Sequence, residues 1–178
     1  MTKVYFGMIV SLDGFVNDRD GRIDKLYESY QPHYEFPGAV VMGRNSFDMA
    51  SDPDGYADHY EFQVPLFVLT HHPPEKHPKE NDKLSITFVT NGIESAISRA
   101  KTAANGKDVL VLGANVSQQL LRAKLADELQ ICFAPVLLGQ GTRFFEHLED
   151  LKIQLEKIRT YVDNQQVESW YKIIQQPN

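Results

Sequence analysis

The chain has 178 residues, of which 42% are hydrophobic, and its formal net charge is −6. This length and hydrophobic content predict a single domain over residues 1–178 and exclude a disordered chain. No basic cluster is visible and no apolar stretch approaches the roughly 20 residues of a membrane helix, which argues against nucleic-acid and membrane partners. Because no signal peptide is visible, we expect a cytoplasmic protein.

Apolar runs of four to seven residues predict the strands of a central sheet. Strands that are buried on both faces have this pattern, and it is typical of parallel sheets covered by helices. The predicted strands are Val4–Val10, Ala39–Met42, Leu66–Leu69, Ile86–Val89, Val109–Leu112 and Leu129–Phe133.

Helical patterns fall between these runs. Apolar residues at helical spacing predict one helix over residues 93–104 and a second over residues 116–123, and a short third helix is expected to start near Arg44. Alternating strands and helices predict an α/β fold.

The last third of the chain changes to period-two alternation. Leu151–Glu156 and Val167–Ile173 alternate in this way, and Asp163–Gln165 lies between them as a turn. This pattern predicts an antiparallel hairpin with one polar face, added at the edge of the sheet.

Two predicted strands end in a glycine that is followed by a helix, an arrangement suited to phosphate binding. The first junction consists of Gly43, Arg44, Asn45 and Ser46, and the second of Gly113, Ala114, Asn115 and Val116. Glycine permits close approach of a phosphate, arginine can bind it with two hydrogen bonds, and helix amides attract anions. An ordinary strand–turn–helix with a surface arginine would have the same sequence.

Two further strand ends carry turn-forming residues. The first strand ends in Ser11, Leu12, Asp13 and Gly14, which is also the pattern of a tight turn without chemistry. Gly139-Gln140-Gly141 follows the sixth strand, and it lacks the third glycine of a dinucleotide fingerprint.

In order and spacing, these segments resemble the dihydrofolate-reductase-like fold, and more closely the riboflavin-biosynthesis reductase domain that forms the C-terminal domain of deaminase–reductase proteins. The resemblance covers nearly the whole chain, and we expect no deaminase domain before it. It implies a three-layer α/β/α fold with a mixed, mostly parallel sheet and a C-terminal antiparallel hairpin. It also implies an NADP(H)-dependent oxidoreductase that acts on a small molecule and forms a homodimer.

The best-matched reaction is reduction of 5-amino-6-(5-phosphoribosylamino)uracil in riboflavin biosynthesis. Reduction of a dihydrofolate or pterin remains an alternative. A nucleotide-binding module that has lost catalysis is another.

The resemblance assigns roles to individual residues. It places the cofactor phosphates at the two glycine junctions, and the adenosine ribose with its 2′-phosphate at Thr70 and His71. It places substrate at Ser11 and Asp13, with Asp13 as the catalytic residue that handles a proton, either directly or through a water molecule. The turn with Gly139 and Gly141 would wall the substrate site.

This chain departs from the family pattern at two of these positions. Ala114 stands where the family usually has a second glycine, and His71 stands where it often has a more basic residue. Asp24 or Glu28 would be the alternative acids.

We expect no metal site. His71, His72 and His77 are close in sequence but lack the spacing of metal ligands on one helix face. Cys132 is the single cysteine and lies within a predicted strand, where a buried and unreactive thiol is expected.

Overall fold

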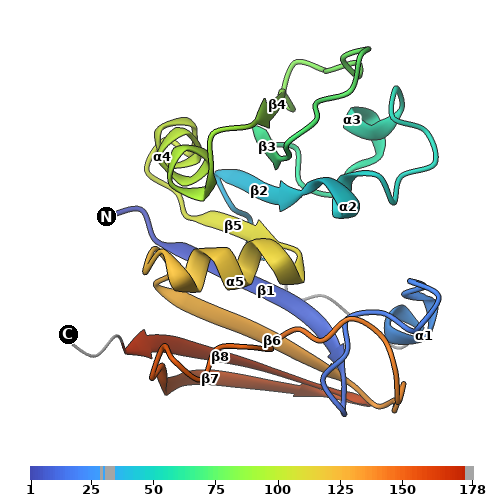
Figure 1. The fold of residues 1–178 in the computed structure, drawn as a ribbon, viewed down its shortest axis with the longest axis vertical. Helices are drawn as coiled ribbons and strands as arrows, with labels where there is room; N and C mark the ends of the chain where they lie inside the picture. The colour runs from blue at the N-terminus through green and yellow to red at the C-terminus, as the bar shows by residue number, and fades with distance from the viewer. Residues whose placement is uncertain (29, 31–34, 175–178) are drawn as a thin grey trace.

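The computed structural model of this protein describes residues 1–28, 30 and 35–174. Over these residues one eight-stranded sheet forms, in the order β4-β3-β2-β5-β1-β6-β8-β7 (Figure 1). The strands are β1 (Val4–Ser11), β2 (Ala39–Gly43), β3 (Leu66–Leu69), β4 (Ile86–Val89), β5 (Val109–Leu112), β6 (Glu128–Ala134), β7 (Gln154–Asp163) and β8 (Gln166–Ile174). The six strands predicted from apolar runs are confirmed.

Helices cover both faces of the sheet, which confirms the three-layer α/β/α fold. The longer helices pack with Val4 and Phe6 of β1 on one face, and the single-turn helices pack with Tyr5 and Ile9 on the other. The longer helices are α4 (Ile93–Ala103) and α5 (Ala114–Arg122); the single-turn helices are α1 (Asp24–Tyr27), α2 (Arg44–Phe47) and α3 (Tyr56–His59). In the part of the chain described, no helix combines the length and apolar character needed to cross a membrane.

Strand direction brings most of the strand ends to one edge of the sheet. β1 pairs in parallel with β5 and β6, and β2 pairs in parallel with β3 and β5, as β3 does with β4. Only β8 and β7 are antiparallel to their neighbours within the described residues. The carboxyl ends of β1 to β6 therefore lie along the same edge, where ligands bind in folds of this kind.

The C-terminal hairpin is present, but β8 does not have the polar face expected from its alternation. β8 lies between β6 and β7, so both of its edges are paired. The alternating residues Gln166, Glu168 and Trp170 are nevertheless buried, and Trp170 is only 1% exposed. Its ring packs 5.2 Å from that of Tyr5 and 4.2 Å from the guanidinium carbon of Arg159, which also pairs with Glu35. The exposed strand of the hairpin is β7, which begins at Gln154 rather than at Leu151.

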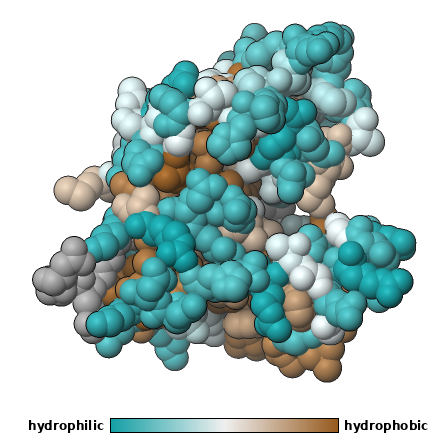
Figure 2. All heavy atoms as spheres, in the orientation of Figure 1, coloured by the Kyte–Doolittle hydropathy of each residue, from teal (hydrophilic) through white to brown (hydrophobic). Residues whose placement is uncertain are grey.

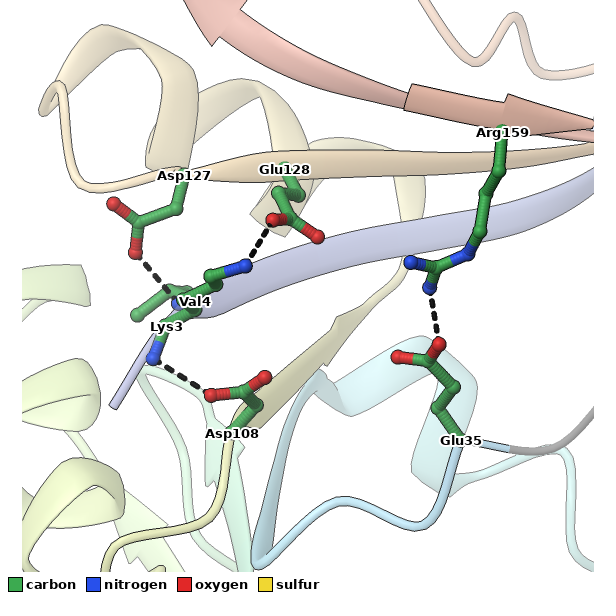
Figure 3. A network of polar contacts seen from close by, with 7 residues as sticks. All are labelled: Lys3, Val4, Glu35, Asp108, Asp127, Glu128 and Arg159. Carbon is green, nitrogen blue, oxygen red and sulfur yellow. Dashed lines mark hydrogen bonds and ion pairs between the residues drawn. The ribbon is translucent and has the colours of Figure 1, made fainter. Parts of the chain in front are cut away.

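Polar contacts hold the amino-terminal ends of the strands together at the start of β1, opposite the carboxyl ends (Figure 3). The backbone N–H of Lys3 donates to Asp108 Oδ1 at 2.8 Å, and its ammonium donates to Glu128 Oε1 at 2.5 Å. The N–H of Val4 donates to Asp127 Oδ2 at 2.7 Å. Because Asp108 precedes β5 and Asp127 precedes β6, these bonds hold three adjacent strands in register and leave the other edge free for a site.

Candidate functional site

A cleft of about 650 Å³ lies at the carboxyl ends of the parallel strands. This volume is within the usual range for small-molecule sites, which is about 300–1,000 Å³. All ten residues predicted to bind cofactor line it: Gly43, Arg44, Asn45, Ser46, Thr70, His71, Gly113, Ala114, Asn115 and Val116. Three separate strand ends therefore contribute these residues to one cavity, although their individual roles remain predictions.

The two glycine junctions are in direct contact with each other. Gly113 has φ +102°, and a Cβ added there would lie 3.1 Å from Ser46 Oγ. A Cβ added at Gly43 would lie 3.0 Å from Val116 Cγ2. The absence of both side chains thus lets the two junctions pack closely beside the first turn of α5. Ala114 is the first residue of α5 and does not have a positive φ, so its methyl group is compatible with the backbone.

Arg44 is held at the rim of the cleft. Its Nε donates to Asp48 Oδ1 at 2.7 Å and its Nη1 donates to the carbonyl of His72 at 2.8 Å. The hydroxyl of Thr70 bonds with the backbone of His72 and closes the turn after β3. These contacts place the guanidinium and the exposed imidazole of His71 on the β2–β3 side of the cleft.

The residues at the end of β1 are engaged in a turn. Ser11 is fully buried, and its Oγ accepts a hydrogen bond from the N–H of Phe15 at 2.9 Å. Asp13 Oδ1 accepts from the N–H of Leu138 at 3.1 Å, and Oδ2 accepts from that of Gly139 at 2.7 Å.

These contacts keep Asp13 ionised. Hydrogen bonding from the Ser11 hydroxyl, and then from the backbone of Leu138 and Gly139, lowers the pKa of Asp13 to about 2. At neutral pH this carboxylate has no proton to donate, so its geometry suits a positioning role.

The loops that follow β1 and β6 are joined along their length. The N–H of Leu12 donates to the carbonyl of Val136, that of Val16 to Thr142, and that of Phe144 to Gly14. None of Ser11, Asp13, Gly139 and Gly141 lines the cleft. They lie in the loops after β1 and β6, which also contain the lining residues Asn17 and Thr142. Substrate contact by these four residues remains a prediction.

Several lining residues were not identified from the sequence. They are Met8, Val16, Asn17, Gly21, Ile23, Met49, Leu69, His72, Thr90, Gly92, Gln119 and Thr142. Thr90 and Gly92 follow a predicted strand and could have been found by the same rule as Thr70. The others depend on how the loops fold. Asp24 and Glu28, the alternative acids, are exposed and do not line the cleft.

No metal-binding arrangement was found in the part of the chain that the structure covers. Within it, no three histidine, cysteine, aspartate or glutamate side chains gather at one point. Cys132 is buried and free, and burial raises the pKa of its thiol to about 12, so the reactive thiolate is not formed at neutral pH.

Comparisons with known proteins agree with this architecture. Residues 2–167 match the family model of the RibD C-terminal domain. A crystal structure from Shewanella sp. PV-4, provisionally named a riboflavin biosynthesis protein, superposes with a TM-score of 0.75 at 24% identity and covers 98% of this chain and 100% of that one. The Saccharomyces riboflavin biosynthesis reductase Rib7 superposes with a TM-score of 0.60 at 16% identity, covering 97% of this chain and 89% of that one. At these identities the two structures show the shared fold.

A sequence relative has a similar extent. YwjB of Bacillus subtilis (strain 168), a protein described as uncharacterized, is 25% identical over 175 residues. The match covers 89% of this chain and 92% of the relative.

Proposed function

This chain belongs to the RibD C-terminal domain family, and on that premise we propose that it is an NADPH-dependent reductase of a small heterocyclic or ribosylamino substrate. The observation that carries the proposal is the convergence of ten strand-end residues on one cleft of about 650 Å³. The preferred substrate is 5-amino-6-(5-phosphoribosylamino)uracil, because the matched family is named for the riboflavin-pathway protein and the similar yeast protein Rib7 is a riboflavin biosynthesis reductase.

The residues of the cleft fit NADPH. α5 is nine residues long, and its first amides, which follow Gly113 at the cleft, suit the pyrophosphate. Arg44 and His71 lie toward β3 and suit the adenosine ribose with its 2′-phosphate. In the sheet, β1 lies on the far side of β5 from β2 and β3, so the nicotinamide would extend toward the end of β1.

In this arrangement the protein positions the reactants and shields them from water. The chemistry that NADPH would supply there is hydride donation to the substrate. The apolar side chains of Met8, Val16 and Ile23 exclude water from the β1 end of the cleft. Asp13 stays ionised and holds in place the loop after β6, which contains Leu138 and Gly139. The proton that accompanies the hydride therefore comes from a water molecule.

Binding of NADPH to an Arg44→Ala variant tests the proposal. If Arg44 binds a phosphate, the loss of a charged hydrogen bond should cost about 1.5–3 kcal/mol and raise the Kd by roughly 10- to 100-fold. Titration of cofactor fluorescence measures the change.

Arg122→Ala is the matched control for this experiment. It also removes one positive charge, but from the end of α5, where Arg122 pairs with Asp150 away from the cleft. An Arg44→Ala protein that binds NADPH as tightly as the control would remove Arg44 from the site. Binding of NADPH without turnover of any pyrimidine or pterin would identify a nucleotide-binding module.

We also propose that the protein forms a homodimer through the β6–β8–β7 side of the sheet. β7 is a ten-residue edge strand that exposes Leu155 and Val162, and Leu137 is exposed at the end of β6. Figure 2 shows apolar surface in this lower part of the molecule. Long exposed edges and apolar patches are usually covered in solution, and a two-fold pair would cover both.

Sedimentation equilibrium at micromolar concentration measures this association. We expect a species of twice the 20.3 kDa chain mass. Leu155→Lys on the exposed strand should shift the equilibrium toward the single chain. A wild-type protein that sediments at 20.3 kDa across this concentration range would contradict the dimer.

A further inference from the structure

The β1 end of the cleft contains a carboxamide whose orientation is set by the protein. Asn17 Oδ1 accepts a hydrogen bond from the backbone N–H of Thr142 at 2.8 Å, and both residues line the cleft. Because the oxygen is used by this bond, the side-chain NH2 group is the remaining polar group. Among the described residues it has no hydrogen-bond partner, and Asn17 is only half-buried, so the NH2 group is available to a ligand.

The backbone on either side of Asn17 is fixed as well. Gly141 packs so closely that a Cβ added there would lie 1.9 Å from the carbonyl oxygen of Asn17. The next residue, Asp18, closes a tight turn in which its Oδ1 accepts from the N–H groups of Asp20 and Arg22, both at 2.9 Å. A donor held in this way loses little conformational entropy when it binds a partner.

The surroundings of Asn17 indicate the kind of group that it meets. Met8, Val16 and Ile23 line the same end of the cleft and offer apolar contacts to the faces of a planar ring. The basic groups Arg44 and His71 lie toward the opposite end, over β2 and β3. A single amide donor among apolar side chains is suited to a carbonyl oxygen carried by a ring.

We propose that the side-chain NH2 of Asn17 donates a hydrogen bond to the carboxamide oxygen of the nicotinamide and so fixes the rotation of that ring against the substrate. This inference rests on the proposed use of NADPH. It adds a specific residue for the nicotinamide half of the cofactor, whereas the strand-end residues are proposed to hold its phosphates and adenosine ribose.

Two probes that differ in the nicotinamide test the proposal. Isothermal titration of wild-type protein, Asn17→Ala and Asn17→Asp is carried out with NADPH and with 2′-phospho-ADP-ribose, which has the same phosphates but no nicotinamide. Asn17→Ala should weaken NADPH by about 3- to 12-fold, the range for a neutral hydrogen bond, and leave 2′-phospho-ADP-ribose unchanged. Asn17→Asp keeps the acceptor for Thr142 and should show the same selective loss.

Arg44→Ala is the matched control, because it should weaken both probes by the same factor. Equal effects of the Asn17 variants on the two probes, or no effect on NADPH, would overturn the inference alone. Wild-type protein that binds neither probe would overturn the proposed function together with the inference.

Discussion

Gly141→Ala is expected to lower the free energy of unfolding by about 3 kcal/mol, and Gly139→Ala by only about 1 kcal/mol. The two glycines belong to the same turn but have different surroundings. A Cβ at Gly141, where φ is +146°, would lie 1.9 Å from the backbone oxygen of Asn17, whereas a Cβ at Gly139, where φ is +74°, would have nothing within 4 Å. Gly141→Ala therefore adds a backbone collision to the strain that both substitutions share.

Urea unfolding of the two variants measures the difference. Because the collision displaces Asn17 and Thr142, Gly141→Ala should also weaken NADPH binding, whereas Gly139→Ala should leave it nearly unchanged. Equal stability of the two variants would show that the loops after β1 and β6 are not packed against each other as described.

Asp13→Asn is expected to lower turnover by roughly 100-fold while the protein remains folded, since a misplacement of about 1 Å at an active site can cost that much. The new amide group would face one of the N–H donors of Leu138 and Gly139 with a donor of its own. The loop would then shift and carry Thr142 away from the cleft. The rate of NADPH oxidation with the ribosylaminopyrimidine substrate measures the effect.

Asp20→Asn provides the control for Asp13→Asn. Asp20 is an exposed carboxylate in the neighbouring turn, where it pairs with Arg19 and Arg22, and it does not line the cleft. Its substitution should leave turnover unchanged. Normal turnover of Asp13→Asn would show that the hydrogen bonds from Leu138 and Gly139 to Asp13 do not matter for catalysis.

The pH dependence distinguishes a positioning role for Asp13 from a proton donor. Its pKa is about 2 in the folded protein and about 3.9 in an unfolded chain, so ionised Asp13 favours the folded state. This stabilisation is fully present above about pH 4 and is lost as the pH falls through 2. Asp13→Asn should lack it. An acid or base limb in the rate profile between pH 5 and 8 that disappears in Asp13→Asn would instead identify Asp13 as the proton donor.

The sequence alone predicted the sheet and ten of the residues that line the cleft. Strands buried on both faces must be apolar along their length, so runs such as Val109–Leu112 are recognisable without an alignment. Parallel strands have their carboxyl ends at the same edge of a sheet, so residues after separate strands had to gather there. That is why Arg44, Thr70, His71 and Gly113 line one cavity although they come from three different strand ends. Their roles toward a cofactor remain predictions.

Only the tertiary structure decided what lies at the β1 end. Ser11 and Asp13 were predicted to bind substrate. In the structure their polar atoms form hydrogen bonds within the turn after β1 and with the loop after β6. The hydrogen-bonded polar pair that lines the cleft there is Asn17 and Thr142, which are 125 positions apart in the chain. The hairpin was expected to have one polar face, but on β8 the polar residues Gln166 and Glu168 are buried, because β7 rather than β8 is the edge strand. A local sequence pattern reports which side chains are apolar, but contacts between distant loops depend on strand order and on which strand becomes the edge.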